Sequence, residues 1–209
     1  MSVEADVLSP VIPRRLPRLP AREQGWPAQG EWTYEDYNRL PDDGRRYEII
    51  EGVLYATAAP NFGHQYTVGE IFAALRTYVR EHQSGIVISA PFEVHLPDVA
   101  RPVQPDVLFV DAERAPRPGA ADFTGAPDLI VEILSPSTAR TDRFVKLGAY
   151  ERAGVREYWL VDPRTRSVEV YPLSEDGTYE MAGQYTPGET VTSTVMSDLA
   201  LPVDDLFVR

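Results

Sequence analysis

The 209-residue sequence contains no cysteine and only one lysine, Lys146, beside nineteen arginines. The absence of cysteine excludes disulfide bonds and thiolate zinc sites and fits a reducing compartment, so we expect a cytoplasmic protein. No apolar run approaches the ~20 residues of a membrane-spanning helix, and the first residues lack the basic and then apolar pattern of a secretory signal. We therefore expect a soluble protein that does not bind membranes.

The sequence also lacks the short motifs of several enzyme classes. It has no GxGxxG, P-loop, HExxH or nucleophile-elbow pattern, and its three histidines do not have the spacing of metal ligands. The formal net charge of −12 argues against a protein that coats nucleic acid nonspecifically, because the phosphates would repel it. Residues 135–156 nevertheless carry five basic and two acidic side chains, which leaves room for a local basic surface.

Residues 1–30 differ in composition from the rest of the chain. They contain five prolines, four arginines and little periodicity, which predicts an extended or disordered N-terminal arm. Residues 31–209 have an ordinary globular composition and a length that suits a single domain with a full hydrophobic core.

Hydrophobic periodicity predicts two main helices and a series of strands. The first helix runs from His64 to residue 82, and the second spans residues 142–153, with Thr141 as N-cap and Gly154 as the C-terminal stop. This order of elements indicates an α/β fold with a mixed sheet. Further elements are expected as a short helix with a Thr33 and Asp36 capping pair, and as strands or hairpins at residues 45–56, 86–90, 92–96, 105–110, 128–134, 156–161, 167–173 and 178–191.

Glu132 lies inside the apolar run DLIVEIL at residues 128–134. Side chains alternate along a strand, so Glu132 shares a face with Ile130 and Leu134. An ionised carboxylate there is costly unless it is paired or binds a cation. Three interpretations stay open: an edge strand on which Glu132 faces water, a structural pair between Glu132 and an arginine, and a functional carboxylate.

Asp106 opens the strand-like segment PDVLFV. A Pro-Asp pair is common in turns, so Asp106 alone indicates little. If its strand neighbours that of Glu132, however, the two acidic side chains together with water suit Mg²⁺ or Mn²⁺.

Lys146 follows Asp142 by four residues in the second predicted helix. A solvated pair with Asp142 would contribute only about 0.3–0.5 kcal/mol, and arginine would serve equally well. The alternative is functional, because a compact ammonium on a flexible stem can donate to a phosphate oxygen or a metal-bound water.

Three further residues give weaker signals. His64 is either a capping or surface residue or a part of the site. Glu48 and Glu51 are three residues apart on a predicted strand, so at most one of them points into a given cleft.

The segments YEIIEGVLY, PDVLFV, APDLIVEILSPST, DRFVKLGAYERAGVREYWLVDP and VEVYPL resemble the Uma-type restriction endonucleases, a bacterial branch of the PD-(D/E)XK nuclease superfamily. The resemblance spans roughly residues 33–208. It implies a restriction-endonuclease-like core, a mixed β-sheet flanked by helices in α-β-β-β-α-β order, here with extra N- and C-terminal strands. The order of elements predicted from periodicity is the same.

By this resemblance Asp106 is the motif aspartate, Glu132 is the motif glutamate, and Glu48 matches a further acidic position. The residue two positions after the glutamate is Leu134 rather than the motif lysine. In this branch the lysine comes from the following helix, and Lys146 is the matching position.

The resemblance implies hydrolysis of phosphodiester bonds in DNA, with Mg²⁺ or Mn²⁺ held by Asp106 and Glu132 and with Lys146 beside the scissile phosphate. His64 and Glu48 are additional candidates for this catalytic site. A homodimer is expected because nucleases of this superfamily often cut as pairs. Two alternatives stay open: a nuclease-fold protein without catalysis that binds nucleic acid or protein, and a glycoside hydrolase, in which Lys146 would have no necessary task.

Overall fold

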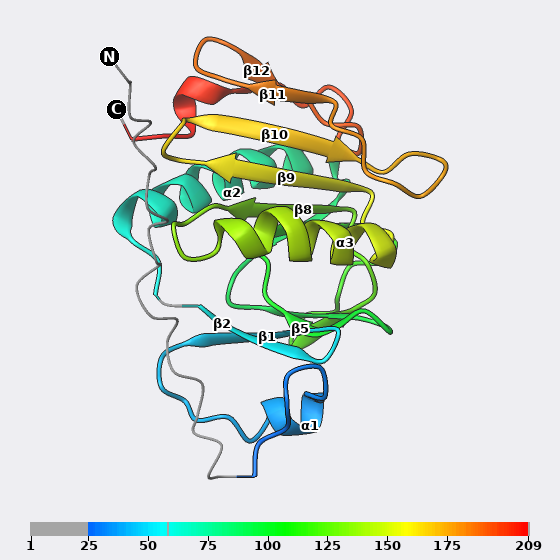
Figure 1. The fold of residues 1–209 in the computed structure, drawn as a ribbon. Coiled ribbons are helices and arrows are strands. Elements are labelled where there is room, and N and C mark those ends of the chain that lie inside the picture. Colours follow the sequence, from blue (N-terminus) through cyan, green and yellow to red (C-terminus); the bar gives the residue numbers. More distant parts are fainter. Residues whose placement is uncertain (1–24, 58, 209) are drawn as a thin grey trace, which may run out of the picture.

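A computed structural model describes residues 25–57 and 59–208 of the chain. Two sheets lie one above the other in Figure 1, a six-stranded sheet at the top and a five-stranded sheet at the bottom. The helices are α1 (Tyr34–Tyr37), α2 (Phe62–His82), the π-helix η2 (Thr141–Lys146), α3 (Leu147–Ala153) and the 3₁₀-helix η3 (Val203–Asp205). The strands are β1 (Arg46–Ile50), β2 (Val53–Thr57), β3 (Gly85–Ser89), β4 (Glu93–Leu96), β5 (Ala100–Val103), β6 (Val107–Asp111), β7 (Asp122–Thr124), β8 (Leu129–Ile133), β9 (Glu157–Asp162), β10 (Ser167–Pro172), β11 (Gly183–Tyr185), β12 (Thr190–Val191) and β13 (Leu201–Pro202).

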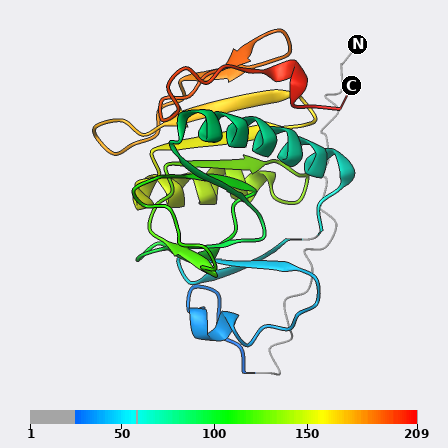
Figure 2. The same cartoon turned by 180° about the vertical axis from the view of Figure 1, so that it is seen from behind.

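The six-stranded sheet has the strand order β11-β10-β9-β8-β6-β3. It is mixed, because β8 and β9 are parallel whereas the other neighbours are antiparallel. Helix α2 crosses one face, seen in front in Figure 2, and η2 with α3 covers the other face, seen in Figure 1. The chain order α2, β3, β6, β8, α3, β9 confirms the predicted α-β-β-β-α-β core.

Strand β8 is buried along its whole length. Leu129, Val131 and Ile133 belong to the apolar cluster beneath α2, whereas Ile130 and Leu134 belong to the cluster beneath α3. The alternation predicted for this segment is therefore confirmed, and the α3 side is the one on which Glu132 lies.

Helix α2 begins two residues before the predicted start. The side chain of Asn61 accepts a hydrogen bond from the backbone N–H of His64 (3.0 Å), which makes Asn61 the N-cap and Phe62 the first helical residue. The helix packs on the six-stranded sheet through Ile71, Leu75 and Val79.

The five-stranded sheet has the order β2-β1-β5-β4-β7 and contains the predicted extra N-terminal strands as the hairpin β1–β2. The hairpin turn uses Glu51 and Gly52, both with positive φ, and a side chain at Gly52 would collide with the backbone of Gly30. The Gly30 N–H donates to the Gly52 carbonyl (2.8 Å), so this close approach fixes the segment before α1 against the hairpin.

Of the predicted helix ends, one is wrong and two are confirmed. The predicted helix 142–153 is a π-helix followed by α3, and Thr141 is not its N-cap, because Arg140 before it already has helical backbone angles and no side chain caps η2. Gly154 ends α3 with a positive φ of 80°, as predicted. The capping box between Thr33 and Asp36 is confirmed in α1.

The predicted extra C-terminal strands are β10 and β11, which extend the six-stranded sheet beyond β9. The hairpin expected at residues 178–191 is wrong, since β11 pairs with β10 and β12 pairs with β13. Fully buried Val191 pairs with Leu201, so the apolar C-terminal tail provides the partner that a local hairpin would have supplied.

Of the predicted arm, residues 1–24 lie outside the described residues. Within the part that the structure describes, no helix has the length and hydrophobicity that a membrane span requires.

Candidate active site

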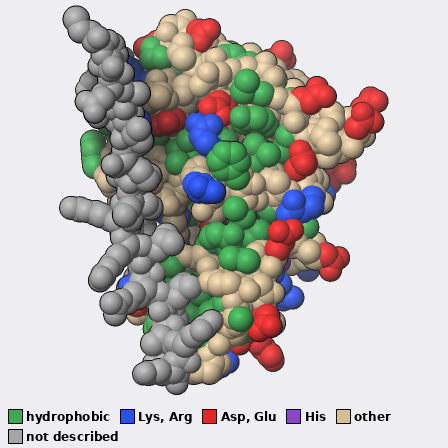
Figure 3. All heavy atoms as spheres, viewed as in Figure 1, with side chains coloured by type: hydrophobic (Ala, Val, Ile, Leu, Met, Phe, Trp, Pro, Cys, Tyr) green, Lys and Arg blue, Asp and Glu red, His purple; other side chains and the backbone are tan. Residues whose placement is uncertain are grey.

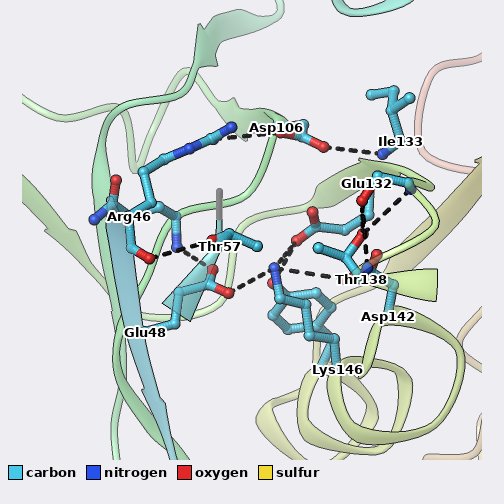
Figure 4. A network of polar contacts seen from close by, with 12 residues as sticks. Arg46, Glu48, Thr57, Asp106, Glu132, Ile133, Thr138, Asp142 and Lys146 are labelled. Carbon is cyan, nitrogen blue, oxygen red and sulfur yellow. Dashed lines mark hydrogen bonds and ion pairs between the residues drawn. The ribbon is translucent and has the colours of Figure 1, made fainter. Parts of the chain in front are cut away.

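A cavity of about 210 Å³ lies between the two sheets, near the point where β8 ends and η2 begins. All five residues predicted for the site line it, and so do two charged residues that were not predicted, Arg46 and Asp142. Its charged and titratable lining residues are Arg46, Glu48, His64, Asp106, Glu132, Asp142 and Lys146. Figure 4 shows most of these side chains pointing toward one another from separate elements.

Glu132 lies in the interior of the six-stranded sheet, because β8 has β6 on one side and β9 on the other. The interpretation of an edge strand that exposes Glu132 to water is therefore wrong. Its Oε1 atom accepts two hydrogen bonds, from Lys146 Nζ (2.9 Å) and from the Tyr150 hydroxyl (2.8 Å). The buried carboxylate is thus held by two donors on the same oxygen.

Lys146 points back from η2 to the sheet. Its Nζ lies 2.9 Å from Glu48 Oε2, 2.9 Å from Glu132 Oε1 and 3.8 Å from Asp142 Oδ1. The residue is only 5% exposed, which excludes the solvated helix lysine considered above. One ammonium therefore bridges carboxylates from both sheets and from its own helix.

The π-helix η2 has wider backbone hydrogen bonding than an α-helix. The N–H of Leu147 donates to the carbonyl of Asp142, five residues earlier, and the buried Tyr158 hydroxyl donates to the same carbonyl (3.2 Å). Single π turns of this kind are frequent at functional sites. Here the turn carries both Asp142 and Lys146 with their side chains buried.

Asp106 lies immediately before β6, and the antiparallel pairing of β6 with β8 brings it beside the end of β8. Its Oδ2 atom accepts from the Ile133 N–H (3.0 Å) and lies 3.1 Å from His64 Nε2. Its Oδ1 atom lies 3.4 Å from an Arg46 guanidinium nitrogen. Nδ1 of His64 is buried and has no hydrogen-bond partner among the described residues.

Glu48 belongs to β1, in the five-stranded sheet. Its Oε1 atom accepts from the Gln104 N–H (2.7 Å) and its Oε2 atom pairs with Lys146. Glu51 instead lies in the hairpin turn and pairs with Arg152 at the surface (2.6 Å). The prediction that at most one of these two glutamates enters the cleft is confirmed.

The basic group of the site is held in its charged form. Burial lowers the pKa of Lys146, but the charges of Glu132, Glu48 and Asp142 raise it more, so the net direction is well above the usual value. Arg46 adds a second positive charge at the cavity wall.

The pKa values of the acidic groups shift in different directions. Burial raises the pKa of Glu132 well above its usual value, and the nearby carboxylates add to this although Lys146 opposes it. Burial likewise raises the pKa of Asp142 to about 6. Burial alone would raise the pKa of Asp106. His64, the Ile133 N–H and Lys146 together lower it by more, so the net pKa lies below the usual value. The cavity is lined by four acidic side chains but only two permanently basic ones, Lys146 and Arg46. This excess of acidic groups favours the uptake of a proton or a metal cation.

Four residues of the site were missed by sequence reasoning: Arg46, Gln104, Asp142 and Tyr150. Asp142 was assigned only to a surface pair with Lys146, although its i, i+4 spacing already placed both side chains on one helix face. Tyr150 gave a similar signal, since it follows Lys146 by four residues. Arg46 and Gln104 gave no signal, because the pairing of distant strands brings them to the cavity.

The donor set fits a hard divalent cation by its chemistry. Asp106 and Glu132 supply carboxylate oxygens, and Mg²⁺ commonly binds through one or two carboxylates while it keeps several waters. Over residues 25–57 and 59–208, no group of three His, Cys, Asp or Glu side chains is arranged to hold a metal ion. Of the four carboxylates that line the cavity, Asp106 and Glu132 are the pair that would hold such a cation, with water as the remaining ligands.

Comparison with known proteins agrees with this geometry. Residues 34–204 match the family model described as "Uma2: Putative restriction endonuclease", whereas no curated protein matches the chain. A crystal structure described as "a putative nuclease belonging to DUF820 from Anabaena variabilis ATCC 29413" is 25% identical and has a TM-score of 0.71, covering 84% of this chain and 97% of that one. The fold is shared with that crystal structure, and the family match extends over most of the sequence. The chain belongs to the Uma2 family of restriction-endonuclease-like proteins.

Proposed function

We propose that the chain is a Mg²⁺-dependent endonuclease that also accepts Mn²⁺ and hydrolyses phosphodiester bonds of DNA. The family description and the description of the similar crystal structure both point to a nuclease. The observation that carries the proposal is the convergence of Asp106, Glu132 and Lys146 on one cavity, although they come from three separate elements. A carboxylate pair beside an ammonium is what metal-assisted phosphodiester hydrolysis needs.

Each side chain has a distinct task in this proposal. Asp106 and Glu132 would hold the cation. When bound, a divalent cation polarises the phosphate and lowers the pKa of a bound water. Lys146 would donate to a phosphate oxygen, or orient the attacking water, as a compact ammonium can.

Glu48 and His64 would act on other residues of the site. Glu48 accepts from the Gln104 N–H with one oxygen and pairs with Lys146 through the other, so it is suited to hold the ammonium in place. His64 lies against the same oxygen of Asp106 that accepts the Ile133 N–H, and so helps to orient that carboxylate.

The acidic net charge does not prevent contact with a polyanion at a local surface. Figure 3 views the face that carries α3, where arginine side chains lie among apolar ones near the centre of the view. Of the basic residues at positions 135–156, Lys146 is buried, and Arg143, Arg152 and Arg156 pair with Glu169, Glu51 and Asp128, so a phosphate would compete with these pairs. Contact between such a surface and phosphates is expected to weaken with salt. The homodimer expected from the family resemblance would present two copies of this face.

Purified protein should be incubated with supercoiled plasmid, linear DNA and RNA, in Mg²⁺, in Mn²⁺ and in a chelator. We expect wild type and the surface control Glu175→Ala to cut DNA with either metal, and Glu132→Ala and Lys146→Ala to fail. If no nucleic acid is cut with either metal, the proposal is wrong. DNA binding without cleavage would identify a binding module, and cleavage of RNA alone would change the substrate class.

A further inference from the structure

Tyr150 lies on α3, one helical turn after Lys146, and is completely buried. Its hydroxyl donates to Glu132 Oε1 at 2.8 Å, and Lys146 Nζ donates to the same atom at 2.9 Å. Tyr150 stands in the segment DRFVKLGAYERAGVREYWLVDP that carries the family resemblance, but it is none of the positions that the resemblance assigns to the site. Two donors on one carboxylate oxygen leave the other oxygen of Glu132 as the one available to the cavity that Glu132 lines.

The two donors differ in how firmly they are held. Lys146 has further carboxylate partners in Glu48 and Asp142, and its ammonium sits on a flexible stem. It can therefore leave Glu132 and still be neutralised. The Tyr150 side chain cannot move away in the same manner, because its ring is packed edge-on against Tyr158 at a centroid distance of 5.2 Å. Because this packing fixes the ring, the hydrogen bond from the Tyr150 hydroxyl to Glu132 Oε1 persists when the ammonium moves.

We infer that Tyr150 is the positioning residue that fixes Glu132 for cation binding, independently of Lys146. This inference rests on the proposed function, since it assigns the cation to Glu132. Lys146 is then free to turn to a phosphate without releasing the carboxylate. Residues that hydrogen-bond to a metal-binding carboxylate typically change metal affinity by 10–100-fold when they are removed.

The test measures Mn²⁺ affinity by calorimetry, without any cleavage assay. Tyr150→Phe keeps the packed ring and removes the hydroxyl. Tyr179→Phe is the matched control, because Tyr179 is largely buried and its hydroxyl donates to a backbone carbonyl, that of Val155, at the other end of α3 (2.8 Å). Lys146→Met removes the second donor to Glu132, and thermal unfolding confirms that each variant is folded.

Tyr150→Phe is expected to weaken Mn²⁺ binding about 10-fold or more, whereas Tyr179→Phe leaves it unchanged and Lys146→Met does not weaken it. Equal affinity of Tyr150→Phe and wild type overturns the inference, and so does an equal loss in the two Phe variants. A loss in Lys146→Met alone would assign the role to Lys146 instead. If wild type binds no Mn²⁺, the proposed metal dependence fails and this inference fails with it.

Discussion

Glu48 of the five-stranded sheet and Glu132 of the six-stranded sheet are joined by one buried ammonium, that of Lys146, which lies 2.9 Å from an oxygen of each. The bridge makes Lys146 structural as well as a candidate for catalysis. Its two roles can be separated, because stability and activity respond differently to the substitutions below.

Lys146→Met should destabilise the protein by about 3–5 kcal/mol at pH 7, since it leaves several buried carboxylates without their cation. The loss should be smaller at pH 5, where those carboxylates take up protons more easily in the folded state. Urea unfolding at the two pH values measures both effects. An unchanged free energy of unfolding at pH 7 would contradict the role of the bridge.

Lys146→Arg should keep the charge and lose most of the nuclease activity. The guanidinium is larger and planar, and the site around a residue that is almost fully buried has been built for a compact ammonium. We expect kcat to fall about 100-fold while the protein stays folded, because the guanidinium would misplace the hydrogen bond that Lys146 donates to the phosphate in the transition state. Full activity would show that position 146 needs only a positive charge.

Asp142→Asn should stabilise the protein above pH 6. The pKa of Asp142 is raised from 3.8 to about 6 mainly by burial, so the folded protein binds this proton more tightly than the unfolded chain. Between the two values the free energy of unfolding therefore falls as pH rises, by about 3 kcal/mol in total.

The asparagine variant lacks this dependence. The variant should therefore have a higher free energy of unfolding than wild type above pH 6. This difference should disappear below about pH 4, where Asp142 of wild type is protonated in both the folded and the unfolded state. Chemical denaturation of wild type and variant over pH 4–8 checks the prediction. A constant difference across that range would show that titration of Asp142 is not its source.

Mg²⁺ or Mn²⁺ should stabilise wild type against thermal unfolding, because the cation binds the folded state alone. At 100 times the dissociation constant the gain is about 2.7 kcal/mol. Glu132→Ala should show no such gain, and Glu175→Ala should match wild type. Thermal scans with and without a chelator give the comparison.

Glu157→Ala should loosen the C-terminal segment without altering the cavity. The fully buried Glu157 carboxylate accepts from the Trp159 indole (2.7 Å), the Ser193 hydroxyl (2.7 Å) and both the N–H and the hydroxyl of Thr194. Loss of such charge-assisted bonds should cost about 2–4 kcal/mol. Amide hydrogen exchange should rise at residues 193–207 while the remaining folded protein keeps its activity. Unchanged exchange there would contradict this role.

The core of the fold could be predicted because its signals are local. The apolar face of α2, the unbroken apolar run of β8 and the left-handed Gly154 each follow from short-range rules. The failures occurred where distant segments compete. Val191 pairs with Leu201 instead of folding into a hairpin, and the Asp142 carbonyl in the π turn at η2 accepts a hydrogen bond from the Tyr158 hydroxyl of a later strand.

Some residues of the candidate site could be predicted from the sequence and others could not. The site position of Lys146 came from the family resemblance, which left open whether its ammonium faces Glu132, and the structure places the two side chains in contact. Arg46 and Gln104 reach the cavity through the second sheet, whose pairing of β1 with β5 has no periodic signature in the sequence. The roles of Asp106, Glu132, Lys146, Glu48 and His64 stay predictions until variants are assayed.

The burial of the only lysine has a practical consequence. Amine-reactive reagents have a single side chain to modify in this chain, and that amine is protonated and enclosed by three carboxylates. Labelling of Lys146 therefore requires the cavity to open or its charge balance to change. The rate at which a small acylating reagent modifies this residue, read by mass spectrometry, would report directly on how often the site opens.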